Sequence, residues 1–526
     1  MKNRPISFSE TGVLKPLIKN YLDNSSAIEP FINQFPSLSA FEEQIKMRQN
    51  QPIERLGLSN ALTNQNQGIN SSVLTGKNIE RLKNTNTFTV TTGHQPCLFT
   101  GPLYFVIKIL NTIKLADTLN NTYPNYHFVP VYWMGAEDHD FEEINHFKLY
   151  NKMLKWETGQ KGAVGRFSTK GLQLVYDELC GILNDGSNAE HLKSLFKKAY
   201  LAGHNYAMAT RMLVNELFGK RGLVIIDGDD PYFKKAFSAV AETELEQKIT
   251  FQEVSNTNAA ISKMGKAQVN PREINLFYLE ENSRKRIIAQ GECFVFDGKA
   301  KQYSKEDILG LLKKYPERFS PNVLLRPVYQ ETILPNLAYI GGMGEMAYWL
   351  QLKSLFKKFE IVMPLLLIRN SFLFLNANQV KKLDKLGLAV KDLFVDEHKL
   401  IRKIVHTHDN AVSFDKEHTE LARVMDELTQ KAVDIDPTLK QVFAGEKQRI
   451  LKSLYNLEKR AFKALKQKNE QKINQAKAIK ERLFPGGGLQ ERSDNFAGFY
   501  EQQGEVFFDD IYEAIDPIDT RLNVLS

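Results

Sequence analysis

The order of apolar and polar positions predicts strands and helices that alternate through most of the chain. Short apolar or β-branched runs, typical of buried strands, occupy residues 87–92, 127–134, 222–227, 337–340 and 361–368. The clearest helical pattern covers residues 102–119, and another covers residues 191–218. Pro364 favours an edge position or a strand end for the last run. This alternation predicts an α/β fold with a parallel sheet.

Two segments interrupt this alternation. Residues 250–330 contain Gly265, Pro271, Gly291 and short alternating pieces, which predict a mixed insertion between the third and fourth strands. We expect another insertion at about residues 146–215. The predicted core with its insertions spans residues 1–376.

The last third of the chain has a helical texture. Helical patterns at residues 417–433 and 438–483, joined by a turn at 434–437, predict an antiparallel hairpin. Apolar positions in the second helix follow a spacing close to a heptad, with a polar interruption near Asn469. We therefore expect a helical coiled-coil domain over residues 377–483, with homodimerisation as a hypothesis. Residues 484–526 are expected to return to the core.

Composition places the chain among soluble cytoplasmic proteins. It has 526 residues, 42% hydrophobic and 25% charged, which is enough for more than one domain. No apolar run reaches the length of a membrane span, and the first residues lack the apolar stretch of a signal peptide. The widely spaced Cys97, Cys180 and Cys293 are expected to be free thiols in a reducing compartment.

The net charge of +7 is concentrated in one predicted helix. Residues 446–482 hold twelve Lys or Arg against four Glu, so the rest of the chain is nearly neutral. Nucleic-acid binding would place aromatic residues among these charges, and only Tyr455 and Phe462 occur there. We interpret the charge as a solvated helix face and expect no nucleic-acid partner.

The first candidate site follows the first predicted strand. The loop from Gly93 to Gly101 lies between that strand and a helix that is expected to begin at Pro102. A helix N-terminus after such a loop offers N–H donors and partial positive charge to an anion. His94 and Gln95 would stand at the mouth of this site, with Thr100 and Tyr104 close by.

The second candidate site follows the second strand. The run Glu137-Asp138-His139-Asp140 precedes Asn145 and lies where ligands bind in open α/β sheets. Carboxylates beside a histidine suit general-base chemistry, binding of an ammonium group or a metal. An acid-rich helix N-terminus is the alternative interpretation, but the density of the cluster favours function. No clear set of three or four ligands is visible, so no metal is predicted.

The third candidate site surrounds a glycine-rich turn. Arg326, Gln330 and Glu331 precede it on a probable turn and helix, and Glu345 follows it. Gly341, Gly342 and Gly344 permit close approach of backbone to a ligand. A tight turn would explain the glycines but would not explain Arg326 or Glu345.

Several long motifs together resemble the BshC family. They run in order from about residue 90 to 495 as GHQPCLFTGPLY, PVYWMGAEDHDFEEINH, NPREINLFYL, RPVYQETILPNLAYIGGMGEMAYWLQLK and FPGGGLQER. The resemblance implies a Rossmann-like core related to class I aminoacyl-tRNA synthetases and a coiled-coil dimerisation domain. It also implies a ligase that joins L-cysteine to glucosaminyl-malate through an amide bond, the last step of bacillithiol biosynthesis.

With this resemblance, roles can be assigned to the candidate residues. His94, Asp138 and His139 are the expected catalytic residues. The expected substrate-binding residues are Gln95, Thr100, Tyr104, Glu137, Asp140, Asn145, Arg326, Gln330, Glu331, Glu345 and Tyr348. The expected nucleotide-binding residues are Gly93, Gly101, Gly341, Gly342, Gly344, Gln490 and Arg492. ATP or ADP is a candidate energy source, and the sequence does not fix it.

A mechanism follows as a hypothesis. An activated cysteine carboxylate would be attacked by the glucosamine amine. His94 would stabilise charge on the phosphate or acyl group, and His139 would take the amine proton. The acids would hold an ammonium or amine group, and Arg326 would bind the malate carboxylates.

Two other classes of function fit parts of the sequence. His94 and the segment 262–266, SKMGK, only partly match the HIGH and KMSKS elements of class I synthetases. This favours a non-catalytic nucleotide-binding scaffold with a dimerisation arm, whereas the dense cluster of acids and histidine disfavours it. A nucleotidyltransferase acting on another small acid is the second alternative.

Overall fold

The computed structural model describes residues 1–409 and 414–526, so residues 410–413 of the expected helical domain lie outside the described part. At its centre is a five-stranded sheet with the order β12-β11-β1-β2-β5, and all of its pairs are parallel. Its strands are β1 (Thr87–His94), β2 (His127–Met134), β5 (Val224–Asp227), β11 (Asn336–Gly341) and β12 (Leu365–Ile368). The predicted α/β class is therefore confirmed, with β12 at an edge.

Both faces of this sheet are buried, which explains the continuous apolar runs of its strands. Along β2, Val129, Val131 and Trp133 join one core cluster, while Tyr132 and Met134 point into another. The second cluster contains the apolar face of α5 (Tyr104–Thr122), which starts two residues later than Pro102 predicts. The carboxyl ends of the parallel strands are thus held at one edge by two packed layers.

The first 261 residues supply many of the helices that surround the main sheet. The predicted helix 191–218 is two helices, separated by a short turn near Gly203, whose φ is +81°. Besides α5 and the strands of the main sheet, the first 261 residues form ten α-helices and two short strands. They are α1 (Pro16–Leu22), α2 (Ala40–Gln49), α3 (Arg55–Gln65), α4 (Val73–Arg81), α6 (Phe141–Ile144), β3 (His146–Leu149), β4 (Lys152–Lys155), α7 (Leu172–Ile182), α8 (Ser187–Tyr200), α9 (Tyr206–Phe218), α10 (Pro231–Gln247) and α11 (Ile249–Ile261).

The mixed region forms a second, antiparallel sheet with the order β10-β6-β7-β8-β9. Its elements are β6 (Leu276–Glu280), β7 (Ser283–Gln290), β8 (Cys293–Phe296), β9 (Gln302–Tyr303), α12 (Lys305–Lys314) and β10 (Phe319–Pro321). The chain then returns to the main sheet through α13 (Leu325–Ile333), α14 (Met343–Trp349) and α15 (Lys353–Lys358). This sheet, called the insertion sheet below, faces the carboxyl edge of the main sheet.

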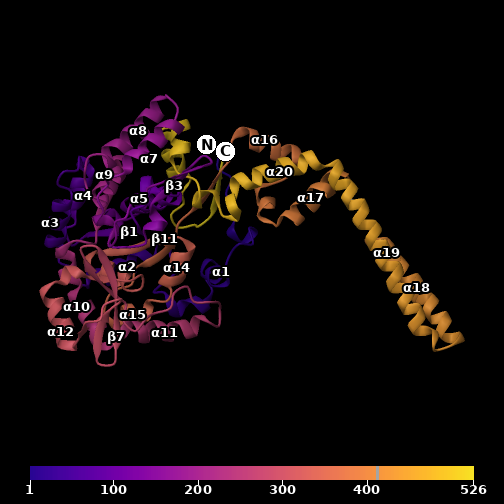
Figure 1. Cartoon of the computed structure of the whole chain (residues 1–526), viewed down its shortest axis with the longest axis horizontal. Helices are drawn as coiled ribbons and strands as arrows, with labels where there is room; N and C mark the ends of the chain where they lie inside the picture. The colour runs from indigo at the N-terminus through magenta and orange to yellow at the C-terminus, as the bar shows by residue number, and fades with distance from the viewer. Residues whose placement is uncertain (410–413) are drawn as a thin grey trace.

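A long helical arm projects from this body (Figure 1). It consists of α16 (Ala377–Leu386), α17 (Glu397–Asp409), α18 (Asp415–Ile435), α19 (Leu439–Lys468) and α20 (Glu470–Leu483). Helices α18 and α19 pack together as the predicted hairpin, and the interruption at Asn469 separates α19 from α20. No described helix is long and apolar enough to cross a bilayer.

After the arm, the chain returns to the body. Helices α21 (Ala497–Gln503) and α22 (Val506–Ala514) lead to β14 (Leu522–Leu525), which pairs in parallel with β13 (Ser371–Phe374). Asn3 and Ile6 bridge to the same strand, so the two termini lie side by side (Figure 1). The segment between α20 and α21 contacts the loop that follows β1 through hydrogen bonds of Asp494 and Asn495.

Candidate functional site

A cavity of about 770 Å³ opens at the carboxyl ends of β1, β2 and β11. Its walls come from these strand ends, from the insertion sheet and from the segment after the arm. The cavity brings together thirteen of the predicted site residues: Gly93, His94, Gln95, Tyr104, Glu137, Asp138, His139, Arg326, Gly342, Gly344, Glu345, Tyr348 and Arg492. Residues from all three candidate sites therefore share one space.

The surroundings of His94 fix its charge and its tautomer. Burial and the positive charge of Lys108 lower the pKa of His94 to about 4. Its Nδ1 lies 2.9 Å from the carbonyl oxygen of Gln95, which can only accept, so Nδ1 carries the proton. At neutral pH the imidazole is thus uncharged, and its Nε2 is the nitrogen without a proton.

Cys97 does not compete for this chemistry. Its Sγ lies 3.7 Å from His94 Nδ1, but burial raises the pKa of the thiol to about 12. A thiol that stays protonated is a poor nucleophile. Cys97 therefore packs behind His94.

Asp138 is the centre of a hydrogen-bonded group. Gln95 Nε2 donates to Asp138 Oδ2 at 2.6 Å and to Glu143 Oε2 at 3.1 Å, which places two carboxylates around one amide. Burial acts to raise the pKa of Asp138, but hydrogen bonds from His139 and Gln95 and the charge of Arg284 outweigh it. The net result is a pKa well below the ordinary value, so Asp138 is ionised.

His139 lies between two charged groups. Its Nδ1 is 3.1 Å from Arg284 Nη1 and 3.4 Å from Asp138 Oδ1, so this nitrogen faces both a donor and an acceptor. His139 thereby links the loop after β2 to the insertion sheet.

An ion pair between Lys108 and Glu345 closes one wall of the cavity. Lys108 Nζ lies 2.8 Å from Glu345 Oε2 and donates to the carbonyl oxygen of Gly93 at 2.6 Å. Glu345 also accepts from Tyr339 and from the backbone N–H of Gly342. Burial opposes ionisation of Glu345, but Lys108 and these donors lower its pKa to about 2. Glu345 thereby joins the glycine turn to the first loop.

Three guanidinium groups in the cavity, those of Arg272, Arg326 and Arg492, have no ion pair with an acidic side chain of the described residues. Arg326 donates to Gln330 Oε1 at 2.9 Å and stands over the rings of Tyr339 and Trp349. Arg492 stands over the ring of Tyr104, 5.9 Å from its centroid. Uncompensated guanidinium groups in a cavity favour carboxylate or phosphate ligands.

Eight predicted site residues do not line this cavity: Thr100, Gly101, Asp140, Asn145, Gln330, Glu331, Gly341 and Gln490. Glu331 is fully buried, accepts from Gln330 and Asn336, and lies 3.5 Å from Arg48. Gln330 in turn accepts from Arg326, so this pair supports a cavity residue from behind.

Five more of these eight residues lie in positions that packing, backbone hydrogen bonds or solvent exposure explain. Gln490 accepts from the backbone N–H of Phe374, and Asn145 is buried beside His146. Asp140 is exposed ahead of α6, and Gly341 accepts from the backbone of Arg369. Gly101 has φ +61° and a Cβ there would lie 2.7 Å from the Cβ of Cys97, so packing alone requires this glycine.

Thr100 and Gly101 belong to a loop that the C-terminal segment holds. Phe99 and Thr100 have φ values of +46° and +69°, which side-chain-bearing residues seldom adopt. Asn495 donates from Nδ2 to the carbonyl oxygens of Phe99 at 2.8 Å and Gly101 at 2.6 Å. The segment after the arm thus fixes the loop between His94 and Tyr104.

Sequence reasoning missed several charged residues of the cavity, namely Lys108, Glu143, Arg272, Arg284 and Arg369. A lysine on the apolar helix after the first strand was a signal for Lys108, and Arg272 lies inside one of the family-like motifs. Arg284 carries no such signal, because its partner Asp138 is 146 positions away.

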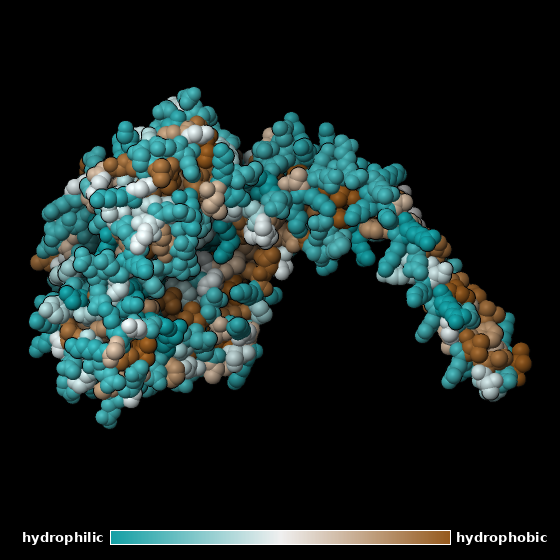
Figure 2. Space-filling model, viewed as in Figure 1, coloured by the Kyte–Doolittle hydropathy of each residue, from teal (hydrophilic) through white to brown (hydrophobic). Residues whose placement is uncertain are grey.

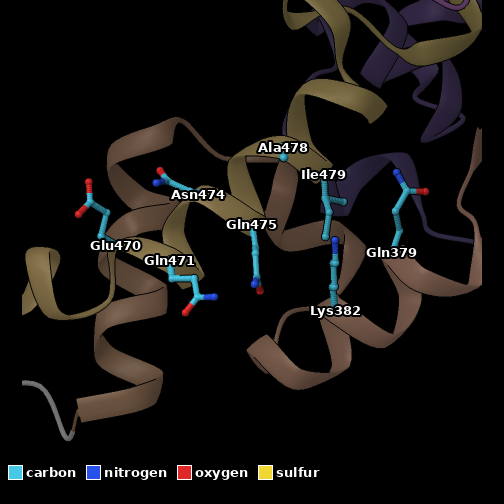
Figure 3. A pocket seen from close by; sticks show the side chains of 8 residues that line it. All are labelled: Gln379, Lys382, Glu470, Gln471, Asn474, Gln475, Ala478 and Ile479. Atoms are coloured by element: carbon cyan, nitrogen blue, oxygen red, sulfur yellow. The ribbon is translucent and has the colours of Figure 1, made fainter.

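Another hollow, of about 620 Å³, lies at the base of the arm between α16 and α20 (Figure 3). Amide side chains such as Gln471, Asn474 and Gln475 dominate its lining, and it contains no predicted site residue. Among the described residues, no group of three or more His, Cys, Asp or Glu is placed to hold a metal ion. The charged and polar site residues therefore gather in the cavity at the carboxyl edge of the main sheet.

The fold and this cavity define a Rossmann-like α/β protein with a polar ligand site at the carboxyl edge of its sheet and a helical arm. Residues 1–370 match the family described as "Bacillithiol biosynthesis BshC, N-terminal Rossmann-like domain". Residues 372–526 match "Bacillithiol biosynthesis BshC, C-terminal coiled-coil domain". The chain belongs to the BshC family.

Full-length relatives agree with this assignment. Proteins of Flavobacterium johnsoniae and Flavobacterium psychrophilum are each 42% identical to this chain, with 99% of both chains covered. A protein of Christiangramia forsetii is 41% identical, covering all of this chain and 99% of its own. All three are named "Putative cysteine ligase BshC".

Proposed function

We propose that this protein is a ligase that joins L-cysteine to glucosaminyl-malate in the last step of bacillithiol biosynthesis. The observation that carries the proposal is the content of one cavity: a neutral histidine with a free Nε2, two carboxylates around Gln95, and guanidinium groups without acidic partners. These groups match an amine nucleophile, an ammonium group and carboxylate or phosphate anions. The names of the full-length relatives support the cysteine-ligase part of this proposal.

The reaction needs an activated carboxylate, because an amine does not displace oxide from a free carboxylate. We propose a nucleoside triphosphate as the activating reactant. A cysteine carboxylate oxygen attacks the α-phosphorus, the bond from that phosphorus to the bridging oxygen of the β-phosphate breaks, and pyrophosphate leaves as the mixed anhydride of cysteine and the nucleoside monophosphate forms. The glucosamine nitrogen then attacks the carbonyl carbon, the carbon–oxygen bond of the anhydride breaks, and the nucleotide leaves as the monophosphate.

His94 accepts a proton during the reaction, and the carboxylates of Asp138 and Glu143 bind positive charge. His94 Nε2 takes the proton that the amine loses as the amide forms, because the imidazole is neutral and its Nδ1 is already bound. Asp138 and Glu143, joined by Gln95, bind the cysteine ammonium group. His139, which lines the cavity beside Asp138, is a further hydrogen-bonding group for the substrate.

The glycine turn and Arg492 are the proposed contacts for the nucleotide. A Cβ at Gly344 would meet no other atom within 4 Å, so open space lies beside this backbone. Gly342 also lines the cavity, and its Cβ would have only ordinary contacts. A phosphate fits such a turn when a guanidinium group such as Arg492 stands nearby. Gly101, Gly341 and Gln490 are occupied by packing and backbone bonds and are not part of this proposal.

The proposal also includes an oligomeric state, which rests on the helical arm. Apolar side chains of α18 and α19 are exposed, including Leu428 at 42% and Leu457 at 53% exposure. Figure 2 shows hydrophobic residues, in brown, gathered toward the end of the arm. A coiled-coil arm with such a surface suits a homodimer. We propose a cytoplasmic homodimer joined through this arm.

Deletion of the gene in its host, followed by mass spectrometry of small thiols and their precursors, tests the reaction. The proposal predicts loss of bacillithiol and accumulation of glucosaminyl-malate. An unchanged bacillithiol pool would contradict it. Loss of bacillithiol without accumulation of glucosaminyl-malate would instead indicate a role at another step, as for a nucleotidyltransferase.

A further inference from the structure

A second hollow adjoins the main cavity on the insertion sheet. This groove, of about 410 Å³, is called the insertion groove, and it is lined by His139, Arg272, Phe277, Arg284, Lys285, Arg286 and Asp297. His139, Arg272, Phe277 and Arg284 line both spaces, so the groove continues the cavity. Its wall differs from the rest of the cavity in carrying four cations and a single carboxylate.

The charges of the insertion groove do not cancel. Arg286 Nη2 lies 2.7 Å from Asp297 Oδ2, and Arg284 Nη1 lies 3.5 Å from Asp138 Oδ1. Arg272 has no ion pair with a described residue, and the adjacent Glu273 pairs with Lys248 at 3.1 Å. With both pairs counted, two positive charges remain. A dicarboxylate is the ligand whose charge matches this excess.

The groove is a built surface. Arg284 lies against the ring of Phe277, 3.9 Å from its centroid, and its Nη2 donates to the carbonyl oxygen of Pro321 at 2.9 Å. Only 8% of the Arg284 side chain is exposed. Arg286 has Nε and Nη2 both bonded to Asp297 Oδ2. Cations fixed in this way bind an anion with little loss of side-chain entropy.

The position of the groove determines where the acceptor and the activated cysteine lie in the cavity. Arg284 joins the groove to Asp138, Asp138 accepts a hydrogen bond from Gln95, and His94 directly precedes Gln95 in the chain. An acceptor anchored in the groove therefore directs its other end toward His94. Arg326 and Arg492 come from different elements and stay available to the cysteine carboxylate and the nucleotide.

We propose that the insertion groove binds the two malate carboxylates of the acceptor, with Arg272 as the main specificity-determining contact. This inference rests on the proposed function and assigns Arg326 to the activated donor in place of malate. It makes the carboxylates a requirement for binding, so a glucosamine derivative without them is a poor acceptor.

Titration calorimetry on the full chain tests this assignment with glucosaminyl-malate, methyl glucosaminide and ATP as separate probes. Arg272→Gln is expected to weaken glucosaminyl-malate binding about tenfold or more, the loss typical of a charged hydrogen bond. Its weak binding of methyl glucosaminide and its affinity for ATP should stay within twofold of wild type. Lys313→Gln, an exposed lysine on α12 of the same insertion, serves as the control of equal charge change.

The outcomes separate the two proposals. Wild-type protein that fails to bind glucosaminyl-malate would overturn the proposed function itself. Wild-type binding that Arg272→Gln leaves unchanged would overturn only the groove assignment. A loss of ATP affinity in Arg272→Gln with intact acceptor binding would likewise overturn it, since the groove would then hold phosphate.

Discussion

At His94 the fold determines the chemistry of a single side chain. A histidine on a loop has an ordinary pKa near 6.5, but burial and Lys108 lower the pKa of His94 to about 4. Between about pH 6.5 and pH 4 the unfolded chain therefore binds a proton that the folded chain does not. The stabilisation from neutral His94 is complete above pH 6.5 and is lost as the pH falls toward 4.

Urea denaturation at pH 7, 6 and 5 measures this effect when wild type is compared with His94→Gln. We expect the free energy of unfolding of wild type, relative to that of the variant, to decrease as the pH falls. The comparison removes the contributions of all other titrating groups. A difference that stays constant over this range would mean that His94 titrates normally.

Asp138 is predicted to serve both ligand and fold. Asp138→Asn would leave Arg284, whose side chain is 8% exposed, without its ionic partner. Leaving such a buried group poorly satisfied costs about 1–3 kcal/mol. We expect a lower thermal midpoint together with lost activity, whereas Glu142→Gln on the exposed side of α6 should change neither. An unchanged thermal midpoint in Asp138→Asn would refute the structural part of this prediction.

The sequence predicted which residue types meet at the site better than it predicted their states. Residues at strand ends, such as His94 and Asp138, were found because parallel strands share one edge. The tautomer of His94 depends on the carbonyl oxygen of Gln95, and His139 contacts Arg284, which comes from a distant insertion. Gln330 and Glu331 were placed in the site but lie behind it, because adjacency in sequence does not show which face of α13 is buried.

At the scale of elements, the segment after the arm controls the loop after β1. Asn495 is 1% exposed and holds two carbonyl oxygens of a loop that contains two residues with positive φ. Asn495→Ala should lower the free energy of unfolding by about 1–3 kcal/mol, because two buried acceptors lose their donor. Chemical denaturation measures this change.

Asn188→Ala provides the matched control for Asn495. Asn188 is half-buried, and its Nδ2 donates to the carbonyl oxygen of Glu501 at 3.3 Å. Its loss should change stability by no more than about 0.5 kcal/mol. Equal effects of the two substitutions would show that Asn495 does not hold the loop.

Elements were predicted well where the pattern was local and long. The strand at 127–134 has the predicted bounds, since both of its faces are buried and its apolar run is continuous. The helix predicted at 191–218 is broken near Gly203, where the pattern continues but the backbone turns. The pairing within the insertion sheet needed tertiary information that short alternating runs do not contain.

At the scale of the whole molecule, the exposed apolar side chains of the arm predict that the protein forms a dimer. No residue of α19 is buried, although the helix carries an apolar stripe. Leu428→Glu with Leu457→Glu should convert a dimer to a monomer at micromolar concentration, because charged side chains would replace exposed apolar ones. Light scattering measures the mass.

The exposed Lys440→Glu on the same helix serves as a control for added negative charge. It should leave the mass unchanged. If wild-type protein is already a monomer at this concentration, the arm has another role.

The central claim is that the cavity around His94 adds cysteine to glucosaminyl-malate. Complementation of the deletion strain with wild type or His94→Gln, expressed at equal levels, tests it most directly when bacillithiol and glucosaminyl-malate are quantified together. Loss of a general base reduces the rate by about 10²–10⁴. The account predicts that wild type restores bacillithiol, whereas the folded His94→Gln protein leaves glucosaminyl-malate accumulated. Full restoration of bacillithiol by His94→Gln would contradict it.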